Sequence, residues 1–520
     1  MTNKLILFFL VILLGITGFS QNTRKITLDV NQVKGKHSEV FKECIGAGRA
    51  NEGLRADWQH QLKTLQDEIG FNYIRFHGLL SDDMGVYRED KNGVPEYNYQ
   101  YIDALFDYLL SVNIRPFVEL GFMPNDLTTG TKTIFWWKGN ISPPKSYEKW
   151  GALIKNLVMH FEQRYGRDEV KKWYFEVWNE PDLKLFFDGT LEEYLHLYDV
   201  SAKAIKSVCN EYKVGGPASA MAYKYETELV KHCFENNIPI DFVSTHSYGV
   251  KSGYLDENGK KGVVIDTSKN SISGRMVRSR ELIKQSKLPD LALHFTEWSS
   301  SYTPTDPIHD SYHSAALILD KIKTAESSVN SMSYWVFTDI FEEHGPRFTP
   351  FHGGFGLFNY QSVKKPAYFA FQYLVQLGKT ELVNTDKASW ACKDEKGGIQ
   401  ILYWDFTPIG PPDSTNDQVF FKRDLPSKPM GDVTVSLRNV PDGKYELQVC
   451  QIGYRVNDVY ALYMDMGSPS QLTLGQVAEM KQKCSGAPIS VEIVKIKNGQ
   501  FEKSLRIREN DVFVLKLNKI

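Results

Sequence analysis

The sequence has 520 residues, more than the roughly 100–200 of one ordinary domain but suited to a barrel-sized domain with a smaller one beside it. Its 42% hydrophobic and 13% aromatic residues are typical of a folded globular protein. The 61 basic and 63 acidic side chains leave a formal charge of -2, which excludes the strong positive field that nucleic acid or an anionic membrane surface requires. We therefore expect a neutral small-molecule partner and no nucleic acid, and the composition leaves homo-oligomerisation open.

The first twenty residues have the pattern of an export signal. Lys4 precedes an apolar run from Leu5 to Gly15, and Gly18 and Ser20 are small residues suited to a cleavage site. The run is shorter than the about 20 residues of a membrane span, although a retained anchor is the alternative. We expect residues 1–20 to be removed and the mature protein to be periplasmic or secreted, without membrane contact.

The cysteines indicate neither a disulfide scaffold nor a metal site. There are six in 520 residues, and none forms a CxxC pair. We expect mostly buried thiols with at most one or two bridges. The sequence also has no HExxH motif and no phosphate-binding GKS/T loop, so neither a metal nor another cofactor is expected.

From residue 41 to 370, short apolar segments alternate with stretches of helical length, as in residues 101–112 and 150–165. This alternation indicates repeated βα units and a parallel sheet. Eight such units predict an α/β fold of the (β/α)8 TIM barrel class, with an open doubly wound sheet as the alternative. The eight predicted strands begin near Cys44, Tyr73, Pro116, Trp173, Lys213, Asp241, Leu291 and Met332.

Residues 371–520 differ in texture, because short alternating runs are bounded there by Gly, Pro, Asn and Asp. This pattern predicts an accessory β-sandwich domain. The segment Ile26–Val33 also alternates, so residues 21–40 are a candidate strand of that sandwich. The predicted sandwich strands are Ile399–Phe406, Val433–Val440, Tyr445–Ile452, Val491–Ile496 and Val512–Leu517.

Two glutamates stand where predicted barrel strands end, which is where barrel active sites lie. Glu180 closes the fourth strand and is followed by Pro181, which breaks the strand ladder. Glu297 closes the seventh strand. Glycosidic cleavage needs such a pair, one carboxyl to donate a proton and one carboxylate to attack the anomeric carbon.

The alternative for either glutamate alone is a helix cap or an arginine partner. The two together, at the ends of the fourth and seventh strands, favour the catalytic interpretation. Glu176 shares the strand parity of Glu180 but lies deeper and has no following proline, so we interpret it as structural.

The motifs around these glutamates resemble glycoside hydrolase family 39 of clan A, and most closely its β-xylosidase branch. The similarity covers nearly the whole mature chain. It includes IRFHGLLSDDMGVYRED (74–90), PFVELGFMP (116–124), FWWKGNISPPK (135–145), WYFEVWNEPDL (173–183), VGGPASA (214–220), DFVSTHSYG (241–249), HFTEW (294–298), FHGGFGLFN (351–359) and VCQIGYRVNDVYALY (449–463).

The resemblance implies a retaining exo-acting enzyme with Glu180 as acid/base and Glu297 as nucleophile. It implies that Asn179 binds the sugar 2-hydroxyl and that Arg75 orients the nucleophile, a role in which an arginine keeps a carboxylate ionised. His246 and Tyr248 match positions around the nucleophile, although a structural histidine is the alternative for His246. The implied sugar contacts are His77, Phe135, Trp335, Glu342 and Glu343; Phe135 also suits a core position, and which of the two glutamates faces the sugar stays open.

By the same resemblance the substrate is a xylo-oligosaccharide that loses xylose from its non-reducing end. The alternatives are α-L-iduronidase, α-L-arabinopyranosidase, β-glucosidase and β-galactosidase activity. An iduronidase needs a cation for the substrate carboxylate, for which Arg347 is a candidate. Two other classes are a glycan-binding protein without catalysis, against which the glutamate pair argues, and a metal-dependent barrel hydrolase, for which no ligand motif is present.

Overall fold

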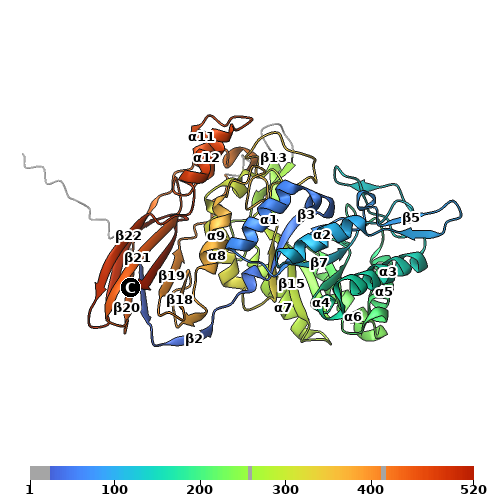
Figure 1. Cartoon of the computed structure of the whole chain (residues 1–520), viewed down its shortest axis with the longest axis horizontal. Coiled ribbons are helices and arrows are strands. Elements are labelled where there is room, and N and C mark those ends of the chain that lie inside the picture. Colours follow the sequence, from blue (N-terminus) through green and yellow to red (C-terminus); the bar gives the residue numbers. More distant parts are fainter. Residues whose placement is uncertain (1–23, 256–260, 412–416) are drawn as a thin grey trace, which may run out of the picture.

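The computed structural model describes residues 24–255, 261–411 and 417–520 (Figure 1). The predicted export signal, residues 1–20, lies outside these ranges. Within them, no helix is both long and apolar enough to cross a bilayer.

Eight parallel strands close into a barrel, which confirms the predicted TIM barrel class. Their hydrogen-bonded order follows the chain order around the ring, as successive βα units require. The barrel strands are β3 (Cys44–Arg49), β4 (Tyr73–His77), β7 (Arg115–Leu120), β10 (Tyr174–Val177), β11 (Lys213–Ser219), β12 (Phe242–Tyr248), β15 (Ala292–Ser299) and β16 (Ser331–Tyr334).

The helices around the barrel bury one apolar stripe each. In α2, Ile102, Leu105, Phe106 and Leu109 are buried at the spacing of one helical face. The capping box of Thr190 and Glu193 starts α5. The outer helices are α1 (Ala56–Glu68), α2 (Gln100–Ser111), α3 (Tyr147–Tyr165), α4 (Arg167–Val170), α5 (Leu191–Val208), α6 (Tyr223–Asn236), α7 (Ser273–Gln285), α8 (His313–Ala325) and α9 (Pro366–Val375).

The barrel interior is filled in layers of opposite character. An aromatic layer lies at the bottom, where the rings of Phe117 and Tyr174 stack at 4.9 Å between centroids. Side chains two residues further along a strand point to the same side. Glu119 and Glu176 therefore follow above that layer, where they are directly opposite each other in the register of β7 and β10. Polar side chains thus begin one step below the C-terminal mouth.

Short connecting elements lie outside the eight βα units. Three are two-stranded sheets, and all three follow barrel strands toward the C-terminal end. They are β5 (Tyr87–Glu89) with β6 (Pro95–Tyr97), β8 (Thr133–Ile134) with β9 (Gly139–Asn140), and β13 (Val250–Leu255) with β14 (Lys261–Ile265); the 3-10 turns are η1 (Val40–Lys42), η2 (Ala50–Leu54), η3 (Asp82–Met84) and η4 (Pro307–Asp310).

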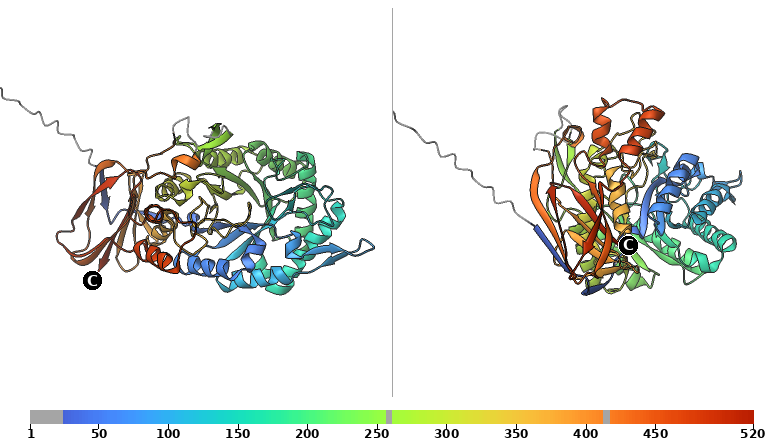
Figure 2. Two further views of the ribbon diagram at one scale, coloured as in Figure 1. Left: turned by 90° about the horizontal axis from the view of Figure 1, so that it is seen from above. Right: turned by 60° about the vertical axis from the view of Figure 1, so that its left-hand side comes forward.

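The accessory domain lies beside the barrel and consists of a seven-stranded and a three-stranded sheet (Figure 2). The two sheets share one apolar core, which includes Ile401 and Leu515 from the larger sheet and Val435 from the smaller one. This is the packing of a sandwich. The strands after the barrel are β17 (Thr380–Leu382), β18 (Ser389–Lys393), β19 (Ile399–Trp404), β20 (Pro429–Arg438), β21 (Gly443–Ile452), β22 (Ser490–Ile496), β23 (Phe501–Arg508) and β24 (Val512–Lys519).

The N-terminal segment joins both accessory sheets before the chain enters the barrel. Strand β1 (Arg24–Asp29) pairs in parallel with β20, and β2 (Val33–Lys36) pairs antiparallel with β17. Ile26 and Leu28 are buried in the sandwich core. The accessory domain is therefore built from both ends of the chain.

Helices interrupt the sandwich sequence, in addition to the expected strands. The short α10 (Asp417–Phe420) precedes β20, while α11 (Val459–Asp465) and α12 (Leu474–Lys483) stand between β21 and β22 and lie over the junction with the barrel (Figure 1). Tyr463 of α11 and Met480 of α12 share an apolar cluster with Phe351 from the loop after β16. The accessory domain thus packs directly on a loop of the barrel's C-terminal face.

All six cysteines are buried thiols, as predicted for most of them, and none forms a bridge.

A buried lysine anchors the long loop that follows β16. Lys365 lies 2.6 Å from a carboxylate oxygen of Asp310 and 2.6 Å from one of Asp339, and all three side chains are fully buried. Its ammonium also donates to the carbonyl of Gly354. The neighbouring Lys364 instead pairs with the half-exposed Glu68 at the surface.

We expect Lys365→Met to lower the free energy of unfolding by about 3–5 kcal/mol, because two carboxylates would remain buried without their cation. Lys364→Met is the matched control and should cost at most about 1 kcal/mol, as for a surface pair. Chemical denaturation of both variants measures the difference. Equal losses would contradict the structural role assigned to Lys365.

Candidate active site

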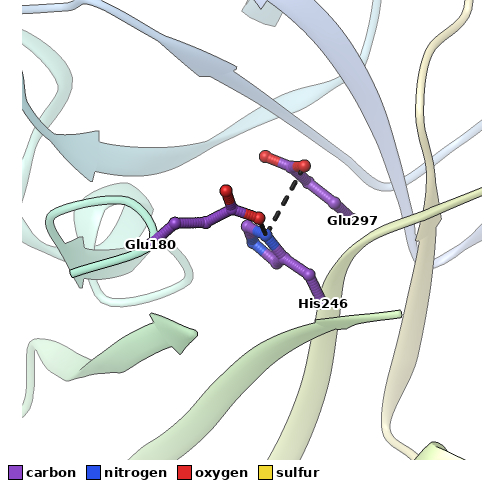
Figure 3. Close-up of side chains that lie close together, drawn as sticks. All are labelled: Glu180, His246 and Glu297. Carbon is purple, nitrogen blue, oxygen red and sulfur yellow. Dashed lines mark hydrogen bonds and ion pairs between the residues drawn. The ribbon is translucent and has the colours of Figure 1, made fainter. Parts of the chain in front are cut away.

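Strand ends bring Glu180, Glu297 and His246 together at the mouth of the barrel (Figure 3). Glu180 follows β10, and its backbone N–H donates to the carbonyl of Ala218 near the end of β11 at 2.9 Å. Its φ of 45° lies in the left-handed region, where a residue other than glycine pays a conformational cost. The hydrogen bond between neighbouring strand ends holds this backbone and directs the Glu180 side chain inward.

A shift in strand register turns Glu297 into the barrel. Phe295 pairs with Thr245, but Glu297 already pairs with His246, so Thr296 is an extra residue on β15. Such a bulge re-aims side chains and is common beside active sites. Both Thr296 and Glu297 therefore face the interior, where Thr296 donates to Glu176 and Glu297 meets Arg75.

Arg75 is the centre of the polar layer and is completely buried. Its guanidinium donates to Glu176 at 2.7 Å and to Glu297 at 2.5 Å, and it lies 2.9 Å from Glu119. It also donates to the side-chain oxygen of Asn179 at 2.8 Å. Burial alone would lower the pKa of Arg75, but the surrounding carboxylates raise it above its usual value, so the cation is permanent.

Both oxygens of Glu297 accept hydrogen bonds. Oε1 accepts from Arg75, and Oε2 accepts from the Tyr248 hydroxyl at 2.6 Å. Burial and the nearby Glu297 raise the pKa of Tyr248 well above its usual value, so this hydroxyl keeps its proton. Two donors aimed at one carboxylate stabilise its charged form and fix its orientation.

Glu180 has the opposite environment. Burial, followed by the negative charges of Glu297 and Asp182, raises the pKa of Glu180 well above its usual value. Its Oε1 lies 2.7 Å from Nδ1 of His246. Burial and Arg75 lower the pKa of His246 well below its usual value, so the ring is neutral and does not offset the raised pKa of Glu180. Glu180 is thus suited to keep its proton at a higher pH than an ordinary glutamate.

The spacing of the two carboxylates decides what they can do together. One oxygen of Glu180 and one of Glu297 lie within 4.8 Å of each other. Retaining glycosidases have carboxyl groups about 5–5.5 Å apart, whereas inverting enzymes leave roughly 6.5–9.5 Å for a water. The separation therefore suits a nucleophile and an acid/base on the same glycosidic bond.

Glu180, His246 and Glu297 could also ligate a metal ion, because one ligand atom of each lies within 4.8 Å of the others. These atoms already have protein partners, however: His246 and Glu180 bond each other, and Arg75 and Tyr248 bond Glu297. Metal binding would displace these contacts, and Arg75 places a permanent positive charge beside the site.

Aromatic side chains wall the pocket above the polar layer. His77 stacks on Phe135 at 5.8 Å between ring centroids and lies 4.8 Å from the ring of Trp335. Glu119 fixes the His77 ring through a 2.6 Å bond to Nδ1, which leaves Nε2 facing Glu297 at 3.6 Å. Phe135 is half-buried and contacts Phe186 of the loop after Glu180. These rings offer flat apolar surfaces next to the carboxylates.

The active site contains buried polar atoms that have no hydrogen-bond partner among the described residues, and two of them bear on ligand binding. They are Nδ2 of Asn179 and Nε2 of His246. Buried polar groups are normally paired, and each exception needs an explanation. Because the oxygen of Asn179 is held by Arg75, its amide nitrogen is left to donate to a bound ligand.

The structure distinguishes the two adjacent glutamates of the loop after β16. Glu342 is held by Arg49 at 2.9 Å and by Arg55 at 3.0 Å. Glu343 lies 3.9 Å from Nε2 of His77. Burial and the nearby Glu297 raise the pKa of Glu343 well above its usual value. Glu343 therefore lies at the pocket, while Glu342 is turned to two arginines and does not share its position.

Glu119 binds both Arg75 and His77, although it is not among the site residues predicted from the sequence. A signal was present, because a carboxylate inside the apolar run PFVEL is out of place in a buried strand. Glu176, expected to be structural, binds Arg75 and Thr296 below the pocket. Asp182 was also missed; it accepts backbone N–H bonds from residues 220–222 and joins the loops after β10 and β11.

The chain is similar in sequence and in structure to known glycosidases. Residues 24–492 match the model of glycosyl hydrolases family 39. A β-xylosidase from Caldicellulosiruptor saccharolyticus is 38% identical over 504 residues, 91% of this chain and 99% of that protein. One from Geobacillus stearothermophilus is 42% identical over 376 residues, 71% and 74% of the two chains. The crystal structure of a monomeric β-xylosidase from Caulobacter crescentus CB15 superposes with a TM-score of 0.92 at 40% identity, covering 96% of this chain and all of that one (100%). The chain belongs to glycosyl hydrolases family 39 and is a glycosidase.

Proposed function

We propose that this enzyme is a retaining exo-β-xylosidase that releases xylose from the non-reducing end of xylo-oligosaccharides. The observation that carries the mechanism is the pair Glu180 and Glu297, within 4.8 Å of each other in opposite electrostatic environments. The substrate is supported by the similarity to β-xylosidases at 38% and 42% identity. Partners other than the glycan are not required by this chemistry.

In the first step, a Glu297 oxygen attacks the anomeric carbon and the glycosidic C–O bond breaks. The departing oxygen takes the proton of Glu180, so the leaving group departs as a neutral alcohol. Arg75 and Tyr248 hold the attacking carboxylate in line, and the sugar becomes an ester of Glu297.

In the second step, Glu180 is a carboxylate and removes a proton from water. The water oxygen attacks the anomeric carbon, the bond to Glu297 breaks, and xylose leaves with its original anomeric configuration. Glu180 regains its proton in this step, so the enzyme returns to its starting state. We assign the Nδ2 of Asn179 to the sugar 2-hydroxyl, a contact that strengthens in the transition state.

The pocket wall suits a small neutral sugar. We assign Phe135, Trp335 and His77 to the apolar C–H faces of the sugar, and Glu343 to a hydroxyl. Burial raises the pKa of Glu343 well above its usual value, so its carboxyl group can donate as well as accept.

The similarity to β-xylosidases does not favour the α-L-iduronidase alternative, for which Arg347 is the candidate cation. Nη2 of Arg347 is buried without a hydrogen-bond partner among the described residues. The charge of Glu343 acts on this guanidinium, which places the two groups near each other. A substrate carboxylate would find a cation there.

We also propose that the enzyme is exported, because of the signal-like residues 1–20. Cell fractionation with N-terminal sequencing tests this proposal; recovery of the enzyme in the cytoplasmic fraction alone, with Met1 intact, would refute it.

Hydrolysis of a 4-nitrophenyl glycoside panel tests the substrate. We expect the highest kcat/KM for β-D-xyloside. The β-D-glucoside and β-D-galactoside carry an extra CH2OH that a pocket for a pentose need not accommodate, and the α-L-arabinopyranoside differs from the xyloside in the orientation of its 4-hydroxyl, so all three should be poorer substrates. Preference for α-L-iduronide would replace the xylosidase proposal by the Arg347-dependent alternative. Unchanged activity after treatment with a chelator would exclude a catalytic metal at the cluster of Glu180, His246 and Glu297.

Variants of the two glutamates test their roles. Glu180→Ala should slow hydrolysis of xylobiose by about 10²–10⁴-fold, the usual contribution of a general acid. It should spare the first step with 2,4-dinitrophenyl xyloside, whose leaving group needs no proton, and azide should accelerate the second step. Glu297→Ala should be inactive on both substrates, even with azide. If both variants respond alike, the roles are wrongly assigned.

Asp182 should affect the pH dependence of catalysis. After burial and Glu297, its charge raises the pKa of Glu180. Since Glu180 must be protonated to act as the acid, Asp182→Asn should lower that pKa and move the alkaline limb of kcat/KM to lower pH. Asp182→Glu keeps the charge and should leave the limb in place. Equal shifts in both variants would show that loop disruption, and not charge, is responsible.

A further inference from the structure

A second open site lies at the C-terminal face of the barrel, between the loop after β4 and the loop after β7. We call it the β4–β7 groove; it is lined by residues 81–83 and by residues between 123 and 140. Its volume is about 700 Å³. Sites for small ligands commonly measure about 300–1,000 Å³, so the groove can hold a molecule the size of a short oligosaccharide.

The lining has the chemistry of a neutral carbohydrate site. The carboxylates of Asp82 and Asp83 and the hydroxyls of Thr131 and Thr133 provide acceptors and donors at its exposed surface. The half-buried indole of Trp137 adds one aromatic surface. Sugars combine hydroxyl groups with apolar C–H faces, which match these two kinds of group. One cation, Lys138, also lines the groove, and Arg49 pairs with Asp83, so the charges of the lining are balanced and suit a neutral ligand.

Hydrogen bonds hold the two walls of the groove to each other. The backbone N–H of Asn125 donates to Asp82 across the groove loops. The side chain of Asn140 donates to the carbonyl of Met123 and to the side-chain oxygen of Asn125. A ligand would therefore meet a preformed surface, and binding would not include the entropic cost of ordering the loops.

The rings of Trp137 and Phe135 stand between the groove and the catalytic pocket. Trp137 lines the groove and contacts Phe135 at 5.2 Å between ring centroids, and Phe135 stacks on His77 beside the carboxylates. The guanidinium of Arg49 lies 5.4 Å from the centroid of the Trp137 ring and pairs with Asp83. The groove is thus adjacent to the pocket but does not include Glu180 or Glu297.

We propose that the β4–β7 groove is a second carbohydrate-binding site, which holds a neutral polysaccharide chain while the catalytic pocket acts on a chain end. Binding at the groove keeps the enzyme on the polymer and raises the local concentration of chain ends at the pocket. The groove goes beyond the proposed function; only the choice of xylan as its ligand rests on that function.

Affinity electrophoresis in gels that contain soluble xylan tests the proposal. The probe protein is Glu297→Gln, which keeps the fold and prevents digestion of the gel. The double variant Thr131→Tyr/Thr133→Tyr fills the groove. Among the described residues, neither threonine hydroxyl forms a hydrogen bond, so the substitutions break none. The matched control is Thr27→Tyr, an exposed threonine on β1 of the accessory domain, where a strand accepts tyrosine readily.

We expect xylan to retard Glu297→Gln and its Thr27→Tyr variant equally, and the filled groove to weaken binding about tenfold or more. With Glu297 intact, the filled variant should hydrolyse 4-nitrophenyl β-D-xyloside with kcat/KM within about twofold of wild type, because the rings of Trp137 and Phe135 separate the groove from the pocket. Equal retardation of the filled and unfilled proteins would overturn the proposal, as would a parallel loss of kcat/KM and retardation.

Failure of the proposed function gives a different result. If the wild-type enzyme does not hydrolyse xyloside, the same gels are made with the neutral polysaccharide of the sugar that the glycoside panel identifies. Retardation that depends on the groove would then support the second site with another glycan, and its absence would overturn the second site as well.

Discussion

The guanidinium of Arg75 is the contact on which the active site depends. It is completely buried, and it joins Glu119, Glu176 and Glu297 from three other barrel strands. Three carboxylates could not be buried together without a cation, because their desolvation and mutual repulsion would be unopposed. The arginine in turn could not be buried without them. Below this layer the barrel is filled with aromatic rings, so the polar network is confined to one level just beneath the mouth.

This network separates the properties of two otherwise similar glutamates. Glu297 has a permanent cation and a protonated tyrosine at its oxygens, which suits an ionised nucleophile. Glu180 stands above the network beside a neutral histidine, and burial raises its pKa. The same pair of residue types therefore performs acid and nucleophilic chemistry at one pH, because their surroundings differ. Arg75 also reaches Asn179, so the residue before the acid/base is fixed by the same side chain.

The accessory domain is tied to the catalytic face by contacts as well as by the chain. Strand β1 from the N-terminal end pairs with β20, so the barrel is inserted in the sequence between two parts of one sandwich. Tyr463 and Met480 from the helices between β21 and β22 pack against Phe351 in the loop after β16. That loop also carries Glu343, and Lys365 anchors its far end between Asp310 and Asp339. A wall of the pocket is thus braced from both domains.

The sequence by itself determined the barrel, its eight strands and the two strand-end glutamates, because the alternation of apolar runs with amphipathic stretches is local and the WNEP and HFTEW motifs mark where strands stop. Other features depend on contacts between distant residues. The bulge that turns both Thr296 and Glu297 inward exists only in the pairing of β15 with β12. No glycine or proline in the segment HFTEW indicates a bulge. The choice of Glu343 over Glu342 follows from Arg49 and Arg55, which lie some 290 positions away in the chain. Tertiary structure decided these points because side-chain orientation and pKa depend on neighbours that the chain brings together only when it folds.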